Sequence, residues 1–362
     1  MKTPSLLLTA LLLGGTNTWL AAQPVSNASP YSAIYVFGDS RSNTTGSPYW
    51  RGRWSNGPMW AEILSTNWGL SYIQTNNYSR YFNTGTTDDV VGNQVPAFKG
   101  SSNASTALFV LWAGCNDIGW HVLDDNAALV PRALTNVAGW SNLIVRMTRN
   151  ISNSVVRLHG KGARTVMVAD LDEVQRLPVY PRLNETQAAQ LKEQINAYNR
   201  ALERTLTALD LSIQNLRLLR LNAHDRWNEF LDQAVNSGFT RVDMGALFDT
   251  ALKDKSFTGP GKDYVFWDQS HPTTRTHGVM AAWIGEIATQ SRTESLRLVA
   301  RGDAFDLGLT RLKPGRKYTV ETSHNLLDWV AHESFTAAEG TNTVTIAPSP
   351  DGPAMRLFRL AW

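Results

Sequence analysis

The chain has 362 residues, of which 43% are hydrophobic and 18% are charged, and its formal net charge is +3. This length and composition allow one large core, or a core with a smaller second domain. The small positive excess, without a dense Lys/Arg cluster, argues against nucleic acid as a partner, and the single cysteine, Cys115, excludes an internal disulfide.

The N-terminus has the pattern of a secretory signal peptide. Lys2 precedes an apolar run from Leu6 to Leu13, and Ala21-Ala22 form a small-residue cleavage site before Gln23. The run is too short to span a bilayer, and no later stretch is long enough. We therefore predict that residues 1–22 are a signal peptide and that the protein is secreted or periplasmic, without a membrane span.

Short apolar runs alternate with helix-period segments in residues 23–290. This alternation predicts βαβ units and a parallel sheet. The predicted strands are 33–37, 108–113, 164–169 and 217–221, with a weaker one at 70–73, and the predicted helices are 59–67, 140–159, 186–208 and 273–290. The region is expected to form one α/β catalytic domain.

The sequence pattern changes in residues 291–362. Apolar and polar residues alternate there, turn residues such as Pro314-Gly315 separate the runs, and no long helical stripe is present. We expect a small C-terminal all-β domain, a β-sandwich, that contributes no catalytic residue. Binding of a polymeric substrate is one role open to such a module.

The first predicted strand stops abruptly at Gly38-Asp39-Ser40, and small polar residues follow. Turn formation is one explanation, because Gly, Asp and Ser all favour turns. The other is that Ser40 lies at the carboxyl edge of the sheet, where open α/β sheets bind ligands. Asp39 is expected to shape the turn by accepting hydrogen bonds from backbone N–H groups.

Three further segments supply the groups that ester hydrolysis needs. Asp268 and His271 stand in one loop, so that the carboxylate can orient an imidazole that activates Ser40. Asn116 follows the strand predicted at 108–113, and Gly85 lies in a polar, turn-prone loop. The Asn116 amide and the backbone N–H groups of Ser40 and Gly85 are candidate donors to the oxyanion.

The order of these segments resembles the GDSL, or SGNH, hydrolase family, whose marker residues are a Ser, a Gly, an Asn and a His in separate blocks. The resemblance covers residues 31–290, and the blocks are FGDS with Ser40, NTG with Gly85, GCND with Asn116 and DQSHP with His271. Gly92 is an alternative for the second block. The resemblance implies a three-layer α/β/α sandwich with a parallel, flavodoxin-like sheet, the SGNH hydrolase fold.

Two features of the sequence bear on the substrate. Arg41 stands where the family's name implies Leu, and we expect it to make the entrance of the site more polar, which disfavours long acyl chains. Trp50, Trp54 and Trp120 lie near the marker blocks. They are candidate walls of a substrate pocket, because aromatic rings bind sugar rings as well as filling cores.

No cofactor and no metal are expected. The nucleophile, base and acid form a complete set without an ion. The adjacent carboxylates Asp88-Asp89 lack the further spaced ligands of a calcium site.

The sequence predicts an exported serine carboxylic-ester hydrolase that forms an acyl-enzyme on Ser40, with a small-molecule or saccharide ester as substrate. Short-chain or carbohydrate-linked (acetyl) esters are favoured, because no long, lid-like apolar segment is present. Two alternatives stay open. One is a lipase or phospholipase-type acylhydrolase that acts on longer acyl chains, and the other is a non-catalytic exported binding protein on a hydrolase fold.

Overall fold

The computed structural model describes residues 6–8, 29–124, 128–180, 183–213, 215–289, 295–301, 304–310, 312, 315–323, 328–338, 341–346 and 357–361. The predicted signal peptide, residues 1–22, lies outside this part except for Leu6–Leu8. The chain divides into two compact units, one comprising Ser26–Thr289 and the other Gln290–Trp362 with Met1–Val25. No helix in the described ranges has the length and apolar character needed to cross a membrane.

A four-stranded parallel sheet forms the centre of the first unit. Its order is β2-β3-β4-β5, with strands Ile34–Gly38, Leu108–Trp112, Thr165–Ala169 and Arg217–Leu221. Every residue of β2 and β3 is buried, as expected for parallel strands whose two faces are both covered. This explains why these strands read as continuous apolar runs, and why all four main strands were predictable from the sequence.

The weaker strand expected at 70–73 was wrong. No strand forms there, and the next segment, Gln74–Asn76, is a 3-10 turn, η2. Beside β2 the chain makes only an isolated parallel bridge between Val36 and Asn77. Asn76 and Asn77 have low β-propensity, so the strand that a flavodoxin-like order places next to β2 is reduced to this bridge.

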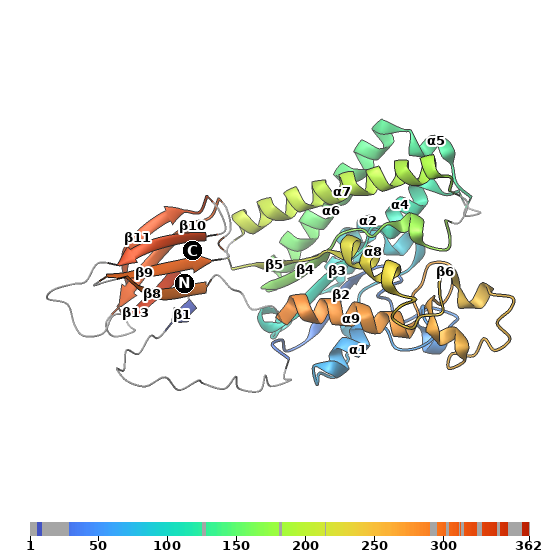
Figure 1. Ribbon diagram of the computed structural model, residues 1–362, viewed down its shortest axis with the longest axis horizontal. Coiled ribbons are helices and arrows are strands. Elements are labelled where there is room, and N and C mark those ends of the chain that lie inside the picture. Colours follow the sequence, from blue (N-terminus) through green and yellow to red (C-terminus); the bar gives the residue numbers. More distant parts are fainter. Residues whose placement is uncertain are drawn as a thin grey trace. The chain divides into compact units, whose positions relative to one another are not determined.

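Helices cover both faces of the sheet, with α6 and α7 on one face and α1 and α9 on the other (Figure 1). The helices are α1 (Trp60–Asn67), α6 (Val137–Gly160), α7 (Glu185–Ser212) and α9 (Thr274–Thr289). On α7 the predicted apolar stripe is buried, at Leu191, Ile195, Tyr198, Leu202 and Leu206. The first unit is therefore the three-layer α/β/α sandwich that was expected.

Several elements were not predicted, and all but the last of those named next have eight residues or fewer. They are α2 (Thr87–Asp89), a π-helical turn η4 (Val90–Gln94), α3 (Val95–Ala97), α4 (Cys115–Val122), α5 (Pro131–Leu134) and α8 (Ala223–Gln233). A second, two-stranded parallel sheet pairs β6 (Arg241–Gly245) with β7 (Tyr264–Phe266). Most of these elements lie in the connections that follow the central strands.

The second unit consists of antiparallel strands in two sheets. One sheet has the order β1-β13-β10-β11, with strands Leu6–Leu8, Leu357–Ala361, Lys317–Ser323 and Val330–Thr336. The other has the order β12-β9-β8, with strands Thr341–Ile346, Ala304–Thr310 and Ser295–Arg301. Both sheets contribute side chains to one small core, including Leu307, Val344, Tyr318 and Val320. This arrangement is the small all-β domain that alternation predicted.

Candidate active site

Ser40 lies at the carboxyl edge of the parallel sheet, directly after β2. The last residue of β2, Gly38, has a φ of +154°, and a Cβ there would lie 2.0 Å from the carbonyl oxygen of Trp112 on β3. Only glycine permits this close approach of the two strands. The carboxylate of Asp39 accepts a hydrogen bond from the N–H of Arg41 at 2.9 Å, so Asp39 shapes the turn as expected.

Ser40, His271 and Asp268 form one hydrogen-bonded row. His271 Nε2 lies 2.8 Å from Ser40 Oγ, and Nδ1 lies 2.7 Å and 2.9 Å from the two carboxylate oxygens of Asp268. Asp268 Oδ1 also accepts from the backbone N–H groups of Ser270 and His271, both at 2.8 Å. The carboxylate therefore assigns the proton to Nδ1 and leaves Nε2 free to accept the serine proton.

The surroundings of Asp268 keep it ionised. Burial by itself raises the pKa of this carboxyl, but the charge of His271 and the hydrogen bonds from His271 and Ser270 outweigh it and lower the pKa below its ordinary value. Tyr49 is a further partner, whose pKa is raised to about 12 by burial and then by the charge of Asp268 and a hydrogen bond to it. No sequence signal connected Tyr49 with Asp268, because the two are far apart in the chain.

Gly85 and Asn116 meet beside the nucleophile. A Cβ on Gly85 would lie 2.9 Å from Asn116 Nδ2 and 3.1 Å from the Cα of Asp39, the residue before Ser40. Gly85 is buried in this position, whereas Gly92 belongs to η4 and has nothing within 4 Å of the corresponding point. Gly85, and not Gly92, therefore lies beside Asn116 and the residue that precedes Ser40.

Asn116 is placed by the first turn of α4, directly after β3. Its Nδ2 lies 3.2 Å from the carbonyl oxygen of Phe82 and 3.3 Å from that of Gly85. The next residue, Asp117, accepts from the N–H of Thr87 at 2.9 Å and from its hydroxyl at 2.7 Å. Burial raises the pKa of Asp117 to about 6, although these hydrogen bonds oppose the rise. The contacts tie α4 to the loop that carries Gly85.

Ser40, Asn116 and His271 line a cavity of about 290 Å³. Part of its wall is apolar and is formed by Leu123, Leu177 and Val179. Two large aromatic side chains, Phe82 and Trp120, also line it while remaining 55% and 49% exposed. The cavity therefore presents both apolar surface and accessible ring faces to a substrate.

The three candidate tryptophans have different positions. Trp54 lines the cavity and lies against the ring of His271, and Trp120 lines the cavity from α4. Trp50 is not among the lining residues, and its ring faces the guanidinium groups of Arg51 and Arg53 instead. The structure thus brings two of the three to the site.

Arg41 lines the cavity, as expected for a residue next to Ser40, but little of it is accessible there. It is only 3% exposed, and its guanidinium pairs with Asp172 at 2.5 Å, so most of its charge is neutralised inside the protein. Asp172 follows β4, and a buried cation is tolerated here because this carboxylate neutralises it. Arg41 Nη2 also contacts Cys115 Sγ at 3.3 Å. Burial raises the pKa of Cys115 to about 12, which keeps the thiol protonated and removes it as a competing nucleophile.

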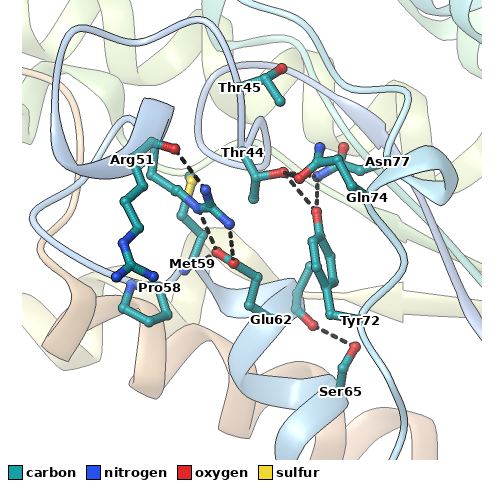
Figure 2. A network of polar contacts seen from close by, with 12 residues as sticks. Thr44, Thr45, Arg51, Pro58, Met59, Glu62, Ser65, Tyr72, Gln74 and Asn77 are labelled. Atoms are coloured by element: carbon teal, nitrogen blue, oxygen red, sulfur yellow. Dashed lines mark hydrogen bonds and ion pairs between the residues drawn. The ribbon is translucent and has the colours of Figure 1, made fainter.

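A polar network holds the segment that follows the nucleophile turn (Figure 2). Thr44 Oγ1 lies 2.6 Å from the hydroxyl of Tyr72 and 2.9 Å from Gln74 Oε1. Farther along, Arg53 donates to Glu62 on α1 at 2.6 Å. None of these five residues lines the cavity, so the network supports the site without contacting a ligand there.

The described residues contain no group of three or more His, Cys, Asp or Glu side chains arranged to hold a metal ion. Asp88 accepts from Asn150 Nδ2 at 2.8 Å, and Asp89 accepts from Asn93 Nδ2 at 2.7 Å. Both carboxylates of the adjacent pair are thus engaged by neighbouring amides.

The chain is similar to known proteins of one family. The model of the GDSL-like lipase/acylhydrolase family matches residues 34–284. The GDSL esterase/lipase EXL2 of Arabidopsis thaliana is 26% identical over 48% of this chain and 48% of its own length, so the match spans about half of that relative. An acetylesterase of Thermothelomyces thermophilus is 25% identical over 76% of this chain and 97% of its own. Among solved structures, an extracellular lipase from Streptomyces rimosus is 14% identical with a TM-score of 0.42, over 70% of this chain and 99% of that chain.

Proposed function

Because this chain belongs to the GDSL-like lipase/acylhydrolase family and is a carboxylic-ester hydrolase, we propose that it cleaves esters through an acyl-enzyme on Ser40. The observation that carries the proposal is the 2.8 Å contact between Ser40 Oγ and His271 Nε2, with Asp268 behind the imidazole. A serine hydroxyl becomes an effective nucleophile when a neighbouring base takes its proton.

The proposed reaction has two halves. In the first, His271 takes the proton of Ser40 as Oγ attacks the ester carbonyl, and the imidazolium then gives that proton to the leaving alcohol. In the second, water attacks the acyl-enzyme with His271 again as the base, which frees the acid and Ser40. In both halves the oxyanion receives hydrogen bonds from the N–H groups of Ser40 and Gly85 and from the Asn116 amide, which exchanges one of its long contacts with the carbonyls of Phe82 and Gly85 for this bond.

We propose short-chain or carbohydrate-linked acetyl esters as the substrate class. The cavity, about 290 Å³, is at the small end of ligand sites, which begin at about 300 Å³. Phe82 and Trp120 offer exposed ring faces of the kind on which sugar rings stack. The relative named acetylesterase, which matches this chain over 97% of its own length, supports the same choice.

A second candidate is hydrolysis of longer acyl esters, which the apolar wall of Leu123, Leu177 and Val179 favours. The test is a series of p-nitrophenyl acetate, butyrate and octanoate, together with an acetylated oligosaccharide. We expect the highest kcat/KM for acetate and release of acetate from the saccharide. A preference for octanoate supports the second candidate instead.

The same assay tests the nucleophile. Ser40→Ala should lower kcat by several powers of ten while the protein stays folded, because the catalytic residues act as one unit. Mass spectrometry after mixing with a fluorophosphonate should show one adduct, on Ser40. Substantial turnover by Ser40→Ala, or labelling elsewhere, refutes the acyl-enzyme on Ser40.

We further propose that residues 1–22 direct export and are then removed, and that residues 291–362 bind a polymeric substrate. N-terminal sequencing of the protein recovered from outside the producing cell tests the first statement, with Gln23 as the expected first residue. Co-sedimentation of residues 291–362 with insoluble acetylated polysaccharide tests the second.

A further inference from the structure

Gln94 makes an unusual set of hydrogen bonds to the backbone near the nucleophile. Its side chain is fully buried, at 0% exposure, and it is the last residue of the π-helical turn η4. Its Oε1 accepts from the N–H of Gly38 at 2.8 Å, and its Nε2 donates to the carbonyl of the same residue at 2.9 Å. One side-chain amide therefore pairs with both polar groups of Gly38, as a neighbouring strand would.

This pairing takes the place of a neighbouring strand on the open edge of β2. β2 has β3 on one side. On the other side, among the described residues, its backbone pairs with the chain at the isolated bridge to Asn77 and at the N–H of Arg80, which donates to the Gly38 carbonyl at 3.0 Å. Without Gln94 the buried N–H of Gly38 would lack this acceptor, and an unpaired buried N–H is costly. The end of β2, two residues before Ser40, thus depends on the Gln94 side chain.

The same amide also reaches the loop that carries Gly85. Its Nε2 lies 2.9 Å from a carboxylate oxygen of Asp89 and 3.3 Å from the carbonyl oxygen of Thr84, the residue before Gly85. Since Nε2 carries two hydrogens, the bonds to Gly38 and Asp89 are the principal ones and the Thr84 contact is the weaker third. Gln94 therefore connects the strand that presents Ser40 to the loop that presents Gly85.

We propose that Gln94 is a positioning residue, which sets the distance between Ser40 and the N–H of Gly85; this inference rests on the acyl-enzyme function proposed above. Oxyanion donors contribute only when they are already in place as charge develops in the transition state. Gln94 does not line the cavity, so substrate binding does not depend on it directly. Its loss therefore lowers kcat rather than raising KM.

The first test compares two variants, each of which loses a side-chain hydrogen bond to a residue of β2. Gln94→Met keeps the length of the side chain and removes its hydrogen bonds, and we expect kcat on p-nitrophenyl acetate to fall roughly 10- to 100-fold with KM unchanged. The control is Asn103→Ala, which removes the oxygen that accepts a 2.9 Å hydrogen bond from the hydroxyl of Tyr35 on β2. We expect the control to lower the melting temperature without lowering kcat.

The second test uses protonation to restore the interaction. In Gln94→Glu, a neutral carboxylic acid can accept from Gly38 N–H and donate to the Gly38 carbonyl, whereas the carboxylate can only accept. The charged group that faces this side chain is Asp89. The carboxylate of Asp89 lies in turn 3.4 Å from the guanidinium of Arg80. We expect the kcat of Gln94→Glu, divided by that of the wild type, to rise as pH falls.

Measurements on the wild type and on the variants test the proposed function and the positioning role of Gln94 separately. The wild-type protein must turn over the ester and be labelled by fluorophosphonate on Ser40; failure there refutes the proposed function. If the wild type passes, the positioning role is refuted by any of three results: unchanged kcat in Gln94→Met, a defect confined to KM, or an equal loss of kcat in Asn103→Ala. A pH-independent ratio for Gln94→Glu also refutes it.

Discussion

The indole ring of Trp54 lies on the imidazole ring of His271, with centroids 4.8 Å apart and planes inclined by 32°. Trp54 is only 6% exposed, so it covers one face of the proposed base more than it offers a surface to a ligand. An aromatic face attracts a cation. In the proposed reaction, the contact therefore favours the imidazolium that His271 becomes on taking the proton of Ser40.

Removal of this ring should slow the reaction more than it weakens binding. A cation–π contact is worth about 1 kcal/mol, which corresponds to a roughly fivefold change in rate. We expect Trp54→Leu to lower kcat by about this factor and Trp54→Phe to retain more of it. Trp120→Leu is the matched comparison, because Trp120 lines the cavity on another element and should affect KM. If Trp54→Leu changed only KM, the prediction would be contradicted, and Trp54 would be a substrate-binding residue.

The two partners of Ser40 should differ in their effects. His271→Ala removes the base and should reduce kcat nearly as much as Ser40→Ala. Asp268→Asn leaves an imidazole that can still accept a proton, so the loss should be smaller, although it still amounts to several powers of ten. Steady-state kinetics of the three variants check the order. A larger loss for Asp268→Asn than for His271→Ala contradicts these roles.

The oxyanion donors give a prediction with an internal control. Asn116→Ala removes one donor, so kcat should fall roughly 100- to 1000-fold with little change in KM. Gly85→Ala should also be damaging, since its Cβ would lie 2.9 Å from both Asn116 Nδ2 and the Arg80 carbonyl. Gly92→Ala has open space at the same point and should leave kcat unchanged. Equal effects of the two glycine substitutions would contradict the assignment of Gly85.

Asp170 should make the folded protein sensitive to pH. Burial raises its pKa from 3.8 to about 7, although hydrogen bonds from the backbone and the charge of His224 oppose the rise. The folded state therefore binds this proton more tightly than the unfolded state, so the free energy of unfolding falls as pH rises from about 4 to about 7. The variant Asp170→Asn carries an amide at this position, which cannot ionise. Relative to that variant, the melting temperature of the wild type should drop between acidic and neutral buffers; a constant difference would contradict the prediction.

Removal of residues 291–362 should leave catalysis on a small ester intact. In the part of the chain that the structure describes, every residue that lines the cavity lies between Asp39 and His271, within the unit Ser26–Thr289. We expect unchanged kcat and KM on p-nitrophenyl acetate, with circular dichroism as the check on folding and Ser40→Ala in the shortened chain as the negative control. A shortened protein that is folded yet inactive would show that residues 291–362 contribute to the active site.

The sequence alone was sufficient to predict the features that show as a local pattern of apolar and polar residues. Buried parallel strands read as apolar runs, and the stripe on α7 repeats at helical spacing, so the main strands, the long helices and the change to alternating strands after the first unit were all predictable. The family was recognisable for a related reason, because each of its blocks is a short contiguous motif with a fixed order. The strand expected at 70–73 does not form, although its residues include Leu70, Tyr72 and Ile73; the chain meets β2 farther on, through the isolated bridge between Val36 and Asn77.

Only the tertiary structure decided which distant residues meet. Arg41 reads as a charge beside the nucleophile, yet folding buries it against Asp172, which lies far along the chain after β4. The contact between the rings of Trp54 and His271 and the pairing of Gln94 with Gly38 likewise join segments that are far apart in the chain. Periodicity records which face of a local element is buried, but it carries no information about which loops the sheet brings together at its carboxyl edge. That choice depends on the packing of the whole domain.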